Sequence, residues 1–142
     1  MVGRQVIAVN RPLSLQELEQ VMQEGWDKER YADFRIGRPT SASIEEYILL
    51  PATYRFLVIV YPRAAGWLFS RQNKVILSVA DTPASAQLAF FEYMPKQGPL
   101  TRLWQTSQVL SAEKERRGPA EEALQAYTAH MRDVLSQHGL LA

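Results

Sequence analysis

The 142-residue sequence contains no cysteine, which excludes disulfide bonds and thiolate metal sites. It also lacks any stretch close to the roughly 18 uninterrupted apolar residues that suggest a membrane-spanning helix. Residues 1–10 have one charge, at Arg4, and only a short alternating pattern, without the longer apolar region of a signal peptide. These absences predict a soluble, cytoplasmic protein with no membrane span.

A large excess of charge of either sign is also missing, because the formal net charge is +1 at pH 7. Proteins that bind nucleic acid or acidic lipid usually show a strong basic patch. Basic and aromatic residues do alternate in the middle of the chain, at Tyr54, Arg55, Tyr61, Arg63, Trp67, Arg71 and Lys74. Such a mixture can form a platform for single-stranded nucleic acid. Since the neighbouring residues are heavily apolar, we interpret these side chains as the rim of an ordinary sheet and predict no nucleic-acid partner.

Signatures of catalysis and of cofactor binding are absent as well. The glycines do not form a dinucleotide or phosphate-binding loop, and no serine lies in a G-x-S-x-G motif. His130 and His138 are eight residues apart, whereas zinc-binding helices place histidines four apart. We interpret both histidines as surface or helix-capping residues. Glu45 and Glu46 would point to opposite faces of a strand and could not act together. The sequence therefore predicts no metal and no cofactor, and gives no support for an enzyme.

A helix start follows the first predicted strand, residues 4–9. Ser14 and Glu17 fit a capping box, in which each side chain accepts a hydrogen bond from the other residue's backbone N–H. Leu13 and Leu18 flank this box at the positions of a hydrophobic staple. The apolar spacing predicts a helix that ends near Gly25, with Trp26 packed just beyond its end.

The middle of the chain is rich in strand patterns. Residues 27–43 show no dominant period, so we predict a loop with one short helical turn. Further strands are predicted over residues 44–50, 54–61, 67–69, 75–79 and 88–94, with a hairpin turn at 70–74. Both faces of the run 54–61 are apolar, which indicates a central strand covered on each side. Short connections favour antiparallel pairing.

The C-terminal third predicts helices. Pro99 suits a first helical position, and the apolar spacing continues to Leu110. Residues 113–117 are charged and are interpreted as a solvated end. From Pro119 one apolar face is predicted, formed by Ala120, Ala123, Leu124, Tyr127, Met131, Val134 and Leu135, and Gly139 and Leu140 fit a Schellman motif at its end.

Residues 1–142 therefore form a single α+β domain: an antiparallel sheet of about five to six strands, with an N-terminal helix and one or two C-terminal helices packed on one face. Two functional hypotheses follow from this architecture. The first is a non-enzymatic interaction module, including the case of a homodimer, because helices at both ends of the chain need not cover the whole sheet.

The second hypothesis is a binder of a small apolar or amphipathic ligand. The order of elements resembles the helix-grip arrangement of the START and Bet v 1 class, which implies a cavity between the sheet and the last helix. The residues that would line this cavity are Phe56, Val58, Leu77, Phe90, Tyr127 and Met131. Glu92 alternates with Phe90 and would anchor a ligand or act as an acid or base if buried, or reach water at the sheet's rim. Without a cavity, the same apolar residues are simply the core.

Overall fold

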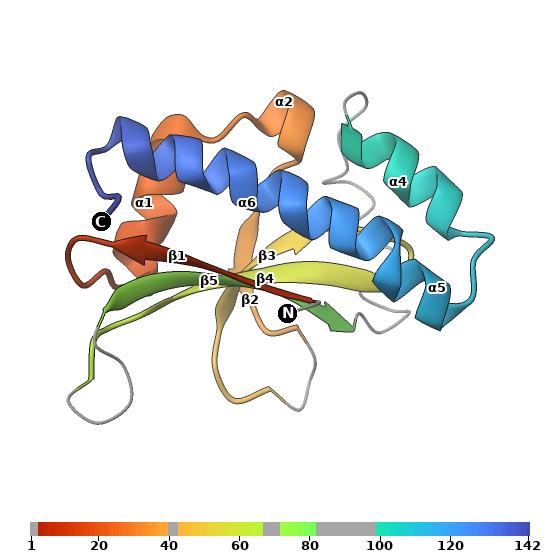
Figure 1. The fold of residues 1–142 in the computed structure, drawn as a ribbon, viewed down its shortest axis with the longest axis horizontal. Coiled ribbons are helices and arrows are strands. Elements are labelled where there is room, and N and C mark those ends of the chain that lie inside the picture. The colour runs from red at the N-terminus through yellow and green to blue at the C-terminus, as the bar shows by residue number, and fades with distance from the viewer. Residues whose placement is uncertain (1–2, 40–42, 67–71, 82–98) are drawn as a thin grey trace.

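The computed structural model describes residues 3–39, 43–66, 72–81 and 99–142 (Figure 1). The strands are β1 (Arg4–Val9), β2 (Arg35–Gly37), β3 (Tyr47–Pro51), β4 (Phe56–Arg63) and β5 (Asn73–Asp81). The helices are α1 (Leu15–Gly25), α2 (Lys28–Tyr31), α4 (Pro99–Ser107), α5 (Ala112–Arg117) and α6 (Pro119–Gln137). This order of elements confirms the α+β class.

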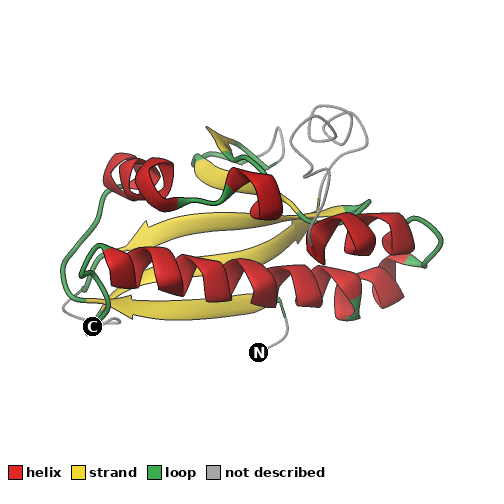
Figure 2. Ribbon diagram, turned by 90° about the horizontal axis from the view of Figure 1, so that it is seen from above, coloured by secondary structure: helices red, strands yellow, loops and turns green. Residues whose placement is uncertain are grey.

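The five described strands form one sheet in the order β1-β5-β4-β3-β2, and every neighbouring pair is antiparallel. Strands β2 to β5 follow one another as a meander, and β1 joins the far edge beside β5. The described helices lie on one side of this sheet, with α6 running across it and contacting β1, β4 and β5 (Figures 1 and 2). The structure therefore confirms an antiparallel sheet with helices packed on one face.

The start of α1 matches the predicted capping box. Ser14 Oγ accepts a hydrogen bond from the Glu17 backbone N–H at 3.1 Å, and Glu17 Oε1 accepts one from the Ser14 N–H at 3.2 Å. Leu13 and Leu18 are both buried, as the staple requires. Trp26 is buried immediately after the helix, where its Nε1–H donates to the carbonyl oxygen of Ala32 at 2.9 Å.

Helix α6 supplies the apolar layer that covers the sheet. All of its predicted core positions are buried, which confirms the face expected from the sequence. At its C-terminal end, the Gly139 N–H donates to Ser136 O at 3.0 Å and the Leu140 N–H donates to Leu135 O at 2.9 Å. These two bonds, together with a φ of +67° at Gly139, form the predicted Schellman motif.

Strand β4 lies at the centre of the sheet and is apolar on both faces, as predicted. Val58 and Val60 face the helices and belong to the main core, which also contains the apolar faces of α1 and α6. Leu57 points to the opposite side and packs against Leu49 of β3 in a second, smaller cluster. Because successive side chains of β4 point to opposite faces, this one strand contributes to both apolar layers.

The bounds of β3 and β4 differ from the prediction. Strand β3 begins at Tyr47, and Ile44 is 90% exposed, because residues 43–46 belong to the connection before the strand. Strand β4 begins at Phe56 and continues through Pro62 to Arg63. Proline is tolerated there because β3 pairs with β4 only as far as Val60, so that Pro62 keeps β5 as its single neighbour.

Residues 27–43 contain more structure than the predicted loop with one helical turn. The turn is α2, whose N-cap Asp27 accepts hydrogen bonds from the N–H groups of Glu29 and Arg30, each at 3.2 Å. The strand β2 was missed because three residues are too short for a periodic signal. The predicted strands 67–69 and 88–94 and most of the turn 70–74 lie outside the described residues, while 75–79 lies within β5.

We expect Gly139→Ala to lower the free energy of unfolding by about 1–2 kcal/mol, because an L-residue is strained in the left-handed conformation. A Cβ at Gly139 would meet no atom within 4 Å, so the cost comes from the backbone alone. Gly66→Ala is the matched control, since Gly66 is equally open and has no positive φ. Urea-induced unfolding measures both variants, and equal stability of the two would contradict the argument.

Candidate functional site

Four of the predicted ligand-binding residues come together at the interface between the sheet and α6. Val58, Leu77, Tyr127 and Met131 are each 0% exposed and belong to one cluster of contacting side chains. The Tyr127 hydroxyl donates a hydrogen bond to the carbonyl oxygen of Pro51, and burial raises the pKa of Tyr127 well above its usual value. These residues are arranged as a packed core in which the one polar group is hydrogen-bonded.

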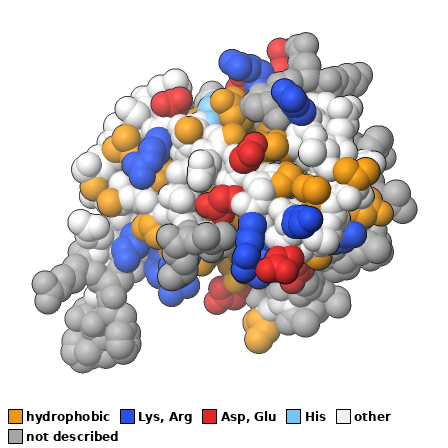
Figure 3. Space-filling model, turned by 45° about the vertical axis from the view of Figure 1, so that its right-hand side comes forward, with side chains coloured by type: hydrophobic (Ala, Val, Ile, Leu, Met, Phe, Trp, Pro, Cys, Tyr) orange, Lys and Arg blue, Asp and Glu red, His pale blue; other side chains and the backbone are white. Residues whose placement is uncertain are grey.

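The remaining predicted site residues lie elsewhere. Phe56 is nearly buried at the start of β4, where it lines an open groove together with Asp81, Ala112, Glu113, Arg116 and Arg117. The charges in this groove are mixed, and on the side of the molecule drawn in Figure 3 acidic and basic side chains are interspersed. Phe90 and Glu92 lie outside the described residues, so the structure does not place them.

His130 is half-buried in an aromatic cluster, which corrects the interpretation of this residue as a surface histidine. Its ring stacks on Tyr31 with a centroid distance of 4.2 Å and lies 4.4 Å from the ring of Trp26. The backbone N–H of Asp27 donates to His130 Nε2 at 3.0 Å, which requires that nitrogen to be unprotonated. Burial lowers the pKa of His130, because the charged imidazolium would lose hydration.

His138 is the C-cap residue of α6, which confirms the predicted capping role. Its Nδ1 lies 2.9 Å from the carbonyl oxygen of Val134, and its Nε2 lies 2.9 Å from Oε2 of Glu24 on α1. The hydrogen bond with Val134 O, followed by that with Glu24, raises the pKa of His138. His138 therefore links the end of α6 to α1, and we assign it a structural role.

The two histidines should titrate on opposite sides of the reference value of 6.5. His130, with its lowered pKa, makes the native state less stable as pH falls from 6.5 through its folded pKa, because the unfolded chain binds the proton first. His138, with its raised pKa, contributes stability at low pH that is lost as pH rises through its folded pKa. NMR titration of the two imidazole rings measures both values. A midpoint above 6.5 for His130 would contradict the buried, neutral assignment.

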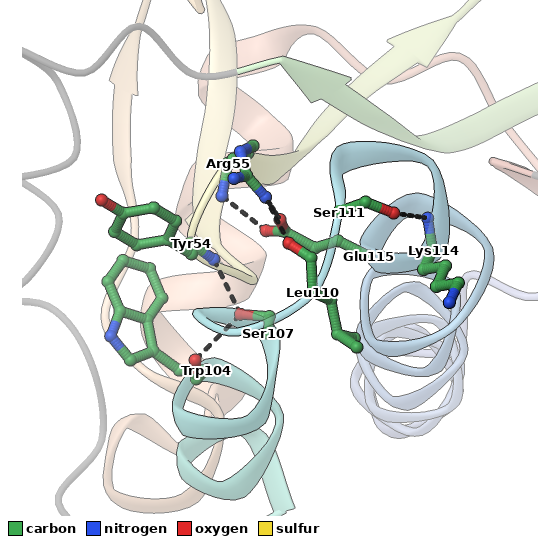
Figure 4. A network of polar contacts seen from close by, with 8 residues as sticks. All are labelled: Tyr54, Arg55, Trp104, Ser107, Leu110, Ser111, Lys114 and Glu115. Atoms are coloured by element: carbon green, nitrogen blue, oxygen red, sulfur yellow. Dashed lines mark hydrogen bonds and ion pairs between the residues drawn. The ribbon is translucent and has the colours of Figure 1, made fainter.

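A buried acidic residue in α5 corrects the interpretation of residues 113–117 as a solvated end. The side chain of Glu115 is 0% exposed. Its Oε1 accepts a hydrogen bond from the backbone N–H of Arg55 at 2.6 Å, and its Oε2 pairs with Arg55 Nη1 at 2.7 Å (Figure 4). The same Nη1 donates to Leu110 O at 2.8 Å. The turn between β3 and β4 is thereby attached to the segment that joins α4 and α5.

A second contact attaches the same turn to α4. The Tyr54 N–H donates to Ser107 Oγ at 3.0 Å, and the Ser107 hydroxyl donates to Trp104 O at 2.8 Å (Figure 4). Ser111 caps α5 by accepting a hydrogen bond from the Lys114 N–H. The sequence analysis did not use this N-cap, although a serine before an acidic turn is typical of a helix start and could have indicated α5. No local sequence pattern could have predicted the pairing of Glu115 with Arg55, because the two residues are 60 positions apart.

We expect Arg55→Met to lower the free energy of unfolding by about 3 kcal/mol, because it leaves a buried carboxylate without its counter-charge. Adding Glu115→Gln should recover part of this loss, since an amide oxygen still accepts the residue-55 N–H. Arg117→Met is the control: its pair with Glu113 is 74% exposed at both side chains, and its loss should change stability by less than about 1 kcal/mol. Urea unfolding of the variants would contradict the argument if both arginine substitutions cost the same.

The side of the sheet opposite the helices is the remaining candidate surface. We call it the helix-free face, and it consists of the strand positions that alternate with the core: Arg4, Val6, Ala8, Arg35, Gly37, Tyr47, Leu49, Pro51, Leu57, Ile59, Tyr61, Arg63, Lys74, Ile76, Ser78 and Ala80. Leu49 and Leu57 are buried at its centre, and the partly exposed side chains of Tyr47, Ile59 and Ala80 pack against them. An apolar layer thus continues onto a face that has no described helix.

Basic residues surround this apolar centre. Arg4 and Arg35 lie on the two edge strands, and Arg63 and Lys74 face each other at one end of the β4–β5 pair. None of the helix-free positions in the five described strands is acidic. The pattern predicts an electrostatic preference for a partner that carries negative charge.

The tyrosines on this face are already in contact with neighbouring side chains. The rings of Tyr47 and Tyr61 meet edge to face at a centroid distance of 5.1 Å. The guanidinium of Arg63 lies over the Tyr61 ring at 5.8 Å, and the Tyr47 hydroxyl bonds to Glu45. Because these contacts occupy the ring of Tyr61, the face differs from the open aromatic platforms that stack nucleic-acid bases.

Comparison with known proteins identified no family: no family model, no curated protein and no solved structure matches. Among the described residues, no group of histidine, aspartate and glutamate side chains is arranged to hold a metal ion. None of the described helices is both long enough and apolar enough to cross a membrane.

Proposed function

We propose that the protein is a non-enzymatic interaction module, which binds an apolar and acidic surface of another protein through its helix-free face. The observation that carries this proposal is the second apolar cluster around Leu49 and Leu57, with Ile59 partly exposed beside it and basic residues at its perimeter. Apolar surface rimmed by polar groups is typical of protein–protein interfaces.

The basic residues of the helix-free face favour an acidic partner over a second copy of the same face. Two helix-free faces packed against each other would bring Arg4, Arg35, Arg63 and Lys74 of both copies together, and like charges across an interface are costly. An acidic partner instead offers a counter-charge to Arg4, Arg63 and Lys74. The near burial of Leu49 and Leu57 favours a shallow protein contact over insertion into lipid, because the most apolar side chains do not project from the surface.

The ligand-binding hypothesis needs a cavity between the sheet and α6. At that interface Val58, Leu77, Tyr127 and Met131 are fully buried and belong to one apolar cluster. Close packing of this kind is expected of a core, whereas a ligand site of drug size encloses a few hundred Å³. This packing favours the interaction module as the first function to test.

A synthetic peptide of alternating leucine and glutamate residues provides a defined probe, with the leucine–lysine peptide of equal length as its counterpart. We expect the acidic peptide to bind about tenfold more tightly than the basic one, and its affinity to fall as salt is added. Arg63→Glu should weaken this binding strongly. Arg116→Glu is the matched control, because Arg116 is equally exposed but lies on α5 and changes the net charge by the same amount.

Fluorescence anisotropy of the labelled peptides measures these affinities. Equal losses for Arg63→Glu and Arg116→Glu would show that net charge alone attracts the peptide and would overturn the proposal. Tighter binding of oligo(dT), or of phosphatidylserine vesicles, than of the acidic peptide would also overturn it, because the face would then serve a nucleic acid or a membrane.

A further inference from the structure

The edge strand β1 presents backbone groups that no described part of the chain uses. The Val79 N–H donates to Gly3 O at 2.9 Å, which fixes the alternation along β1. Odd residues from Gly3 onward direct their backbone groups toward β5, so Arg4 and Val6 direct theirs away from the sheet. Each of these two residues offers one N–H and one C=O at the open edge. Val6 is also partly exposed, at 39% of its surface.

The C-terminal tail of the chain already pairs with this edge farther along β1. The C-terminal residues 140–142 lie beside the end of β1, where the Asn10 N–H donates to Leu140 O at 2.9 Å and the Ala142 N–H donates to Ala8 O at 3.2 Å. Val9 and Leu141 form an antiparallel bridge, and Figure 1 shows the C-terminus next to the end of β1. This tail satisfies the edge at Ala8–Asn10, and no other described residue pairs with Arg4 or Val6 from outside the sheet.

We propose that a second copy of this chain pairs with β1 at its open edge, antiparallel and with Gln5 facing Gln5 of the second copy. In this register Arg4 lies opposite Val6 of the second copy, and each residue of the pair donates one backbone hydrogen bond and accepts one. The pairing is self-complementary, as a two-fold interface requires. It goes beyond the proposed function, because it uses the β1 edge and not the helix-free face.

The neighbouring register is excluded by the C-terminal tail. A two-fold axis at Val6 would place Arg4 of the second copy beside Ala8, in the position that Ala142 occupies. The axis at Gln5 uses the open groups of Arg4 and Val6. The extended conformation of β1 ends at Gly3, whose φ is +85°, before the position of the second copy that would face Ala8. The opposite edge of the sheet offers less, because β2 has three residues and Pro39 follows shortly after it.

This register also separates the charges that oppose a face-to-face dimer. Arg4 meets the apolar Val6 of the second copy directly, and the two Arg4 side chains lie on a diagonal, about 7–8 Å apart at their backbones. The two-fold axis is perpendicular to the sheet, so the two helix-free faces lie on the same side. The dimer therefore leaves both faces available and doubles the proposed docking surface.

Charge substitutions at Val6 test the register directly. We expect Val6→Arg to weaken dimerisation at least about tenfold, because two arginine pairs then face each other across the two-fold axis, and Val6→Glu to retain or tighten it, because glutamate meets Arg4. Loss of an apolar contact alone would weaken both equally. Sedimentation equilibrium of the untagged chain across a concentration series measures the dissociation constants, and added salt should reduce the difference.

Val6→Pro tests the backbone bonds. Its missing N–H points away from β5, so the internal ladder is kept while each copy loses one bond to the other, and we expect about tenfold weaker dimerisation. Val6→Thr keeps the N–H and is the control. Circular dichroism confirms folding, and hydrogen exchange of the Val6 amide in the unmodified chain, slower at high concentration, gives a readout that needs no variant.

A monomer at all concentrations, or a dimer equally sensitive to Val6→Arg and Val6→Glu, would overturn the edge pairing. The peptide assay distinguishes this from failure of the proposed function. Peptide binding that survives in a monomer removes only the edge dimer, and a dimer that ignores the acidic peptide removes only the docking face.

Discussion

The contact between the apolar face of α6 and the sheet is the constraint on which the other features depend. Its buried side chains contact β1, β4 and β5, which brings together parts of the chain separated by more than a hundred residues. Helix α1 completes the same layer, and Trp26 at its end stacks on Tyr127 of α6 at 6.0 Å. All the described helices lie on this side of the sheet, so no described helix covers the apolar residues on the opposite side.

The polar contacts fix how the helices attach to this frame. The Arg55–Glu115 pair joins the β3–β4 turn to α5, and His138–Glu24 joins the end of α6 to α1. Their physical character differs, because Glu115 is fully buried and Glu24 is half-exposed. A buried carboxylate must be matched by its partner, whereas an exposed pair is screened by water. The first contact therefore determines stability more strongly than the second.

The helix-free face and the open β1 edge have the same origin: the described residues leave part of the sheet uncovered. The sheet of five described strands has two edges, and the described residues cover only part of one of them, with the C-terminal tail. A central apolar strand needs cover on both faces, but the described helices lie on only one. The proposed acidic partner would cover the helix-free face, and the proposed second copy would pair with the β1 edge. The basic residues favour the first assignment, because they oppose packing two helix-free faces against each other.

The sequence by itself determined the elements whose signals are local. The capping box at Ser14, the long apolar face of α6, the end at Gly139 and the doubly apolar strand β4 were all predicted, because each depends on residues within a few turns or along one strand. The class of fold followed from their order. Only the tertiary structure decided which distant residues meet: it paired Glu115 with Arg55, placed His130 between aromatic rings and buried four of the predicted pocket residues in one core cluster. Such contacts depend on how the layers stack, and one sequence carries no local signal for that.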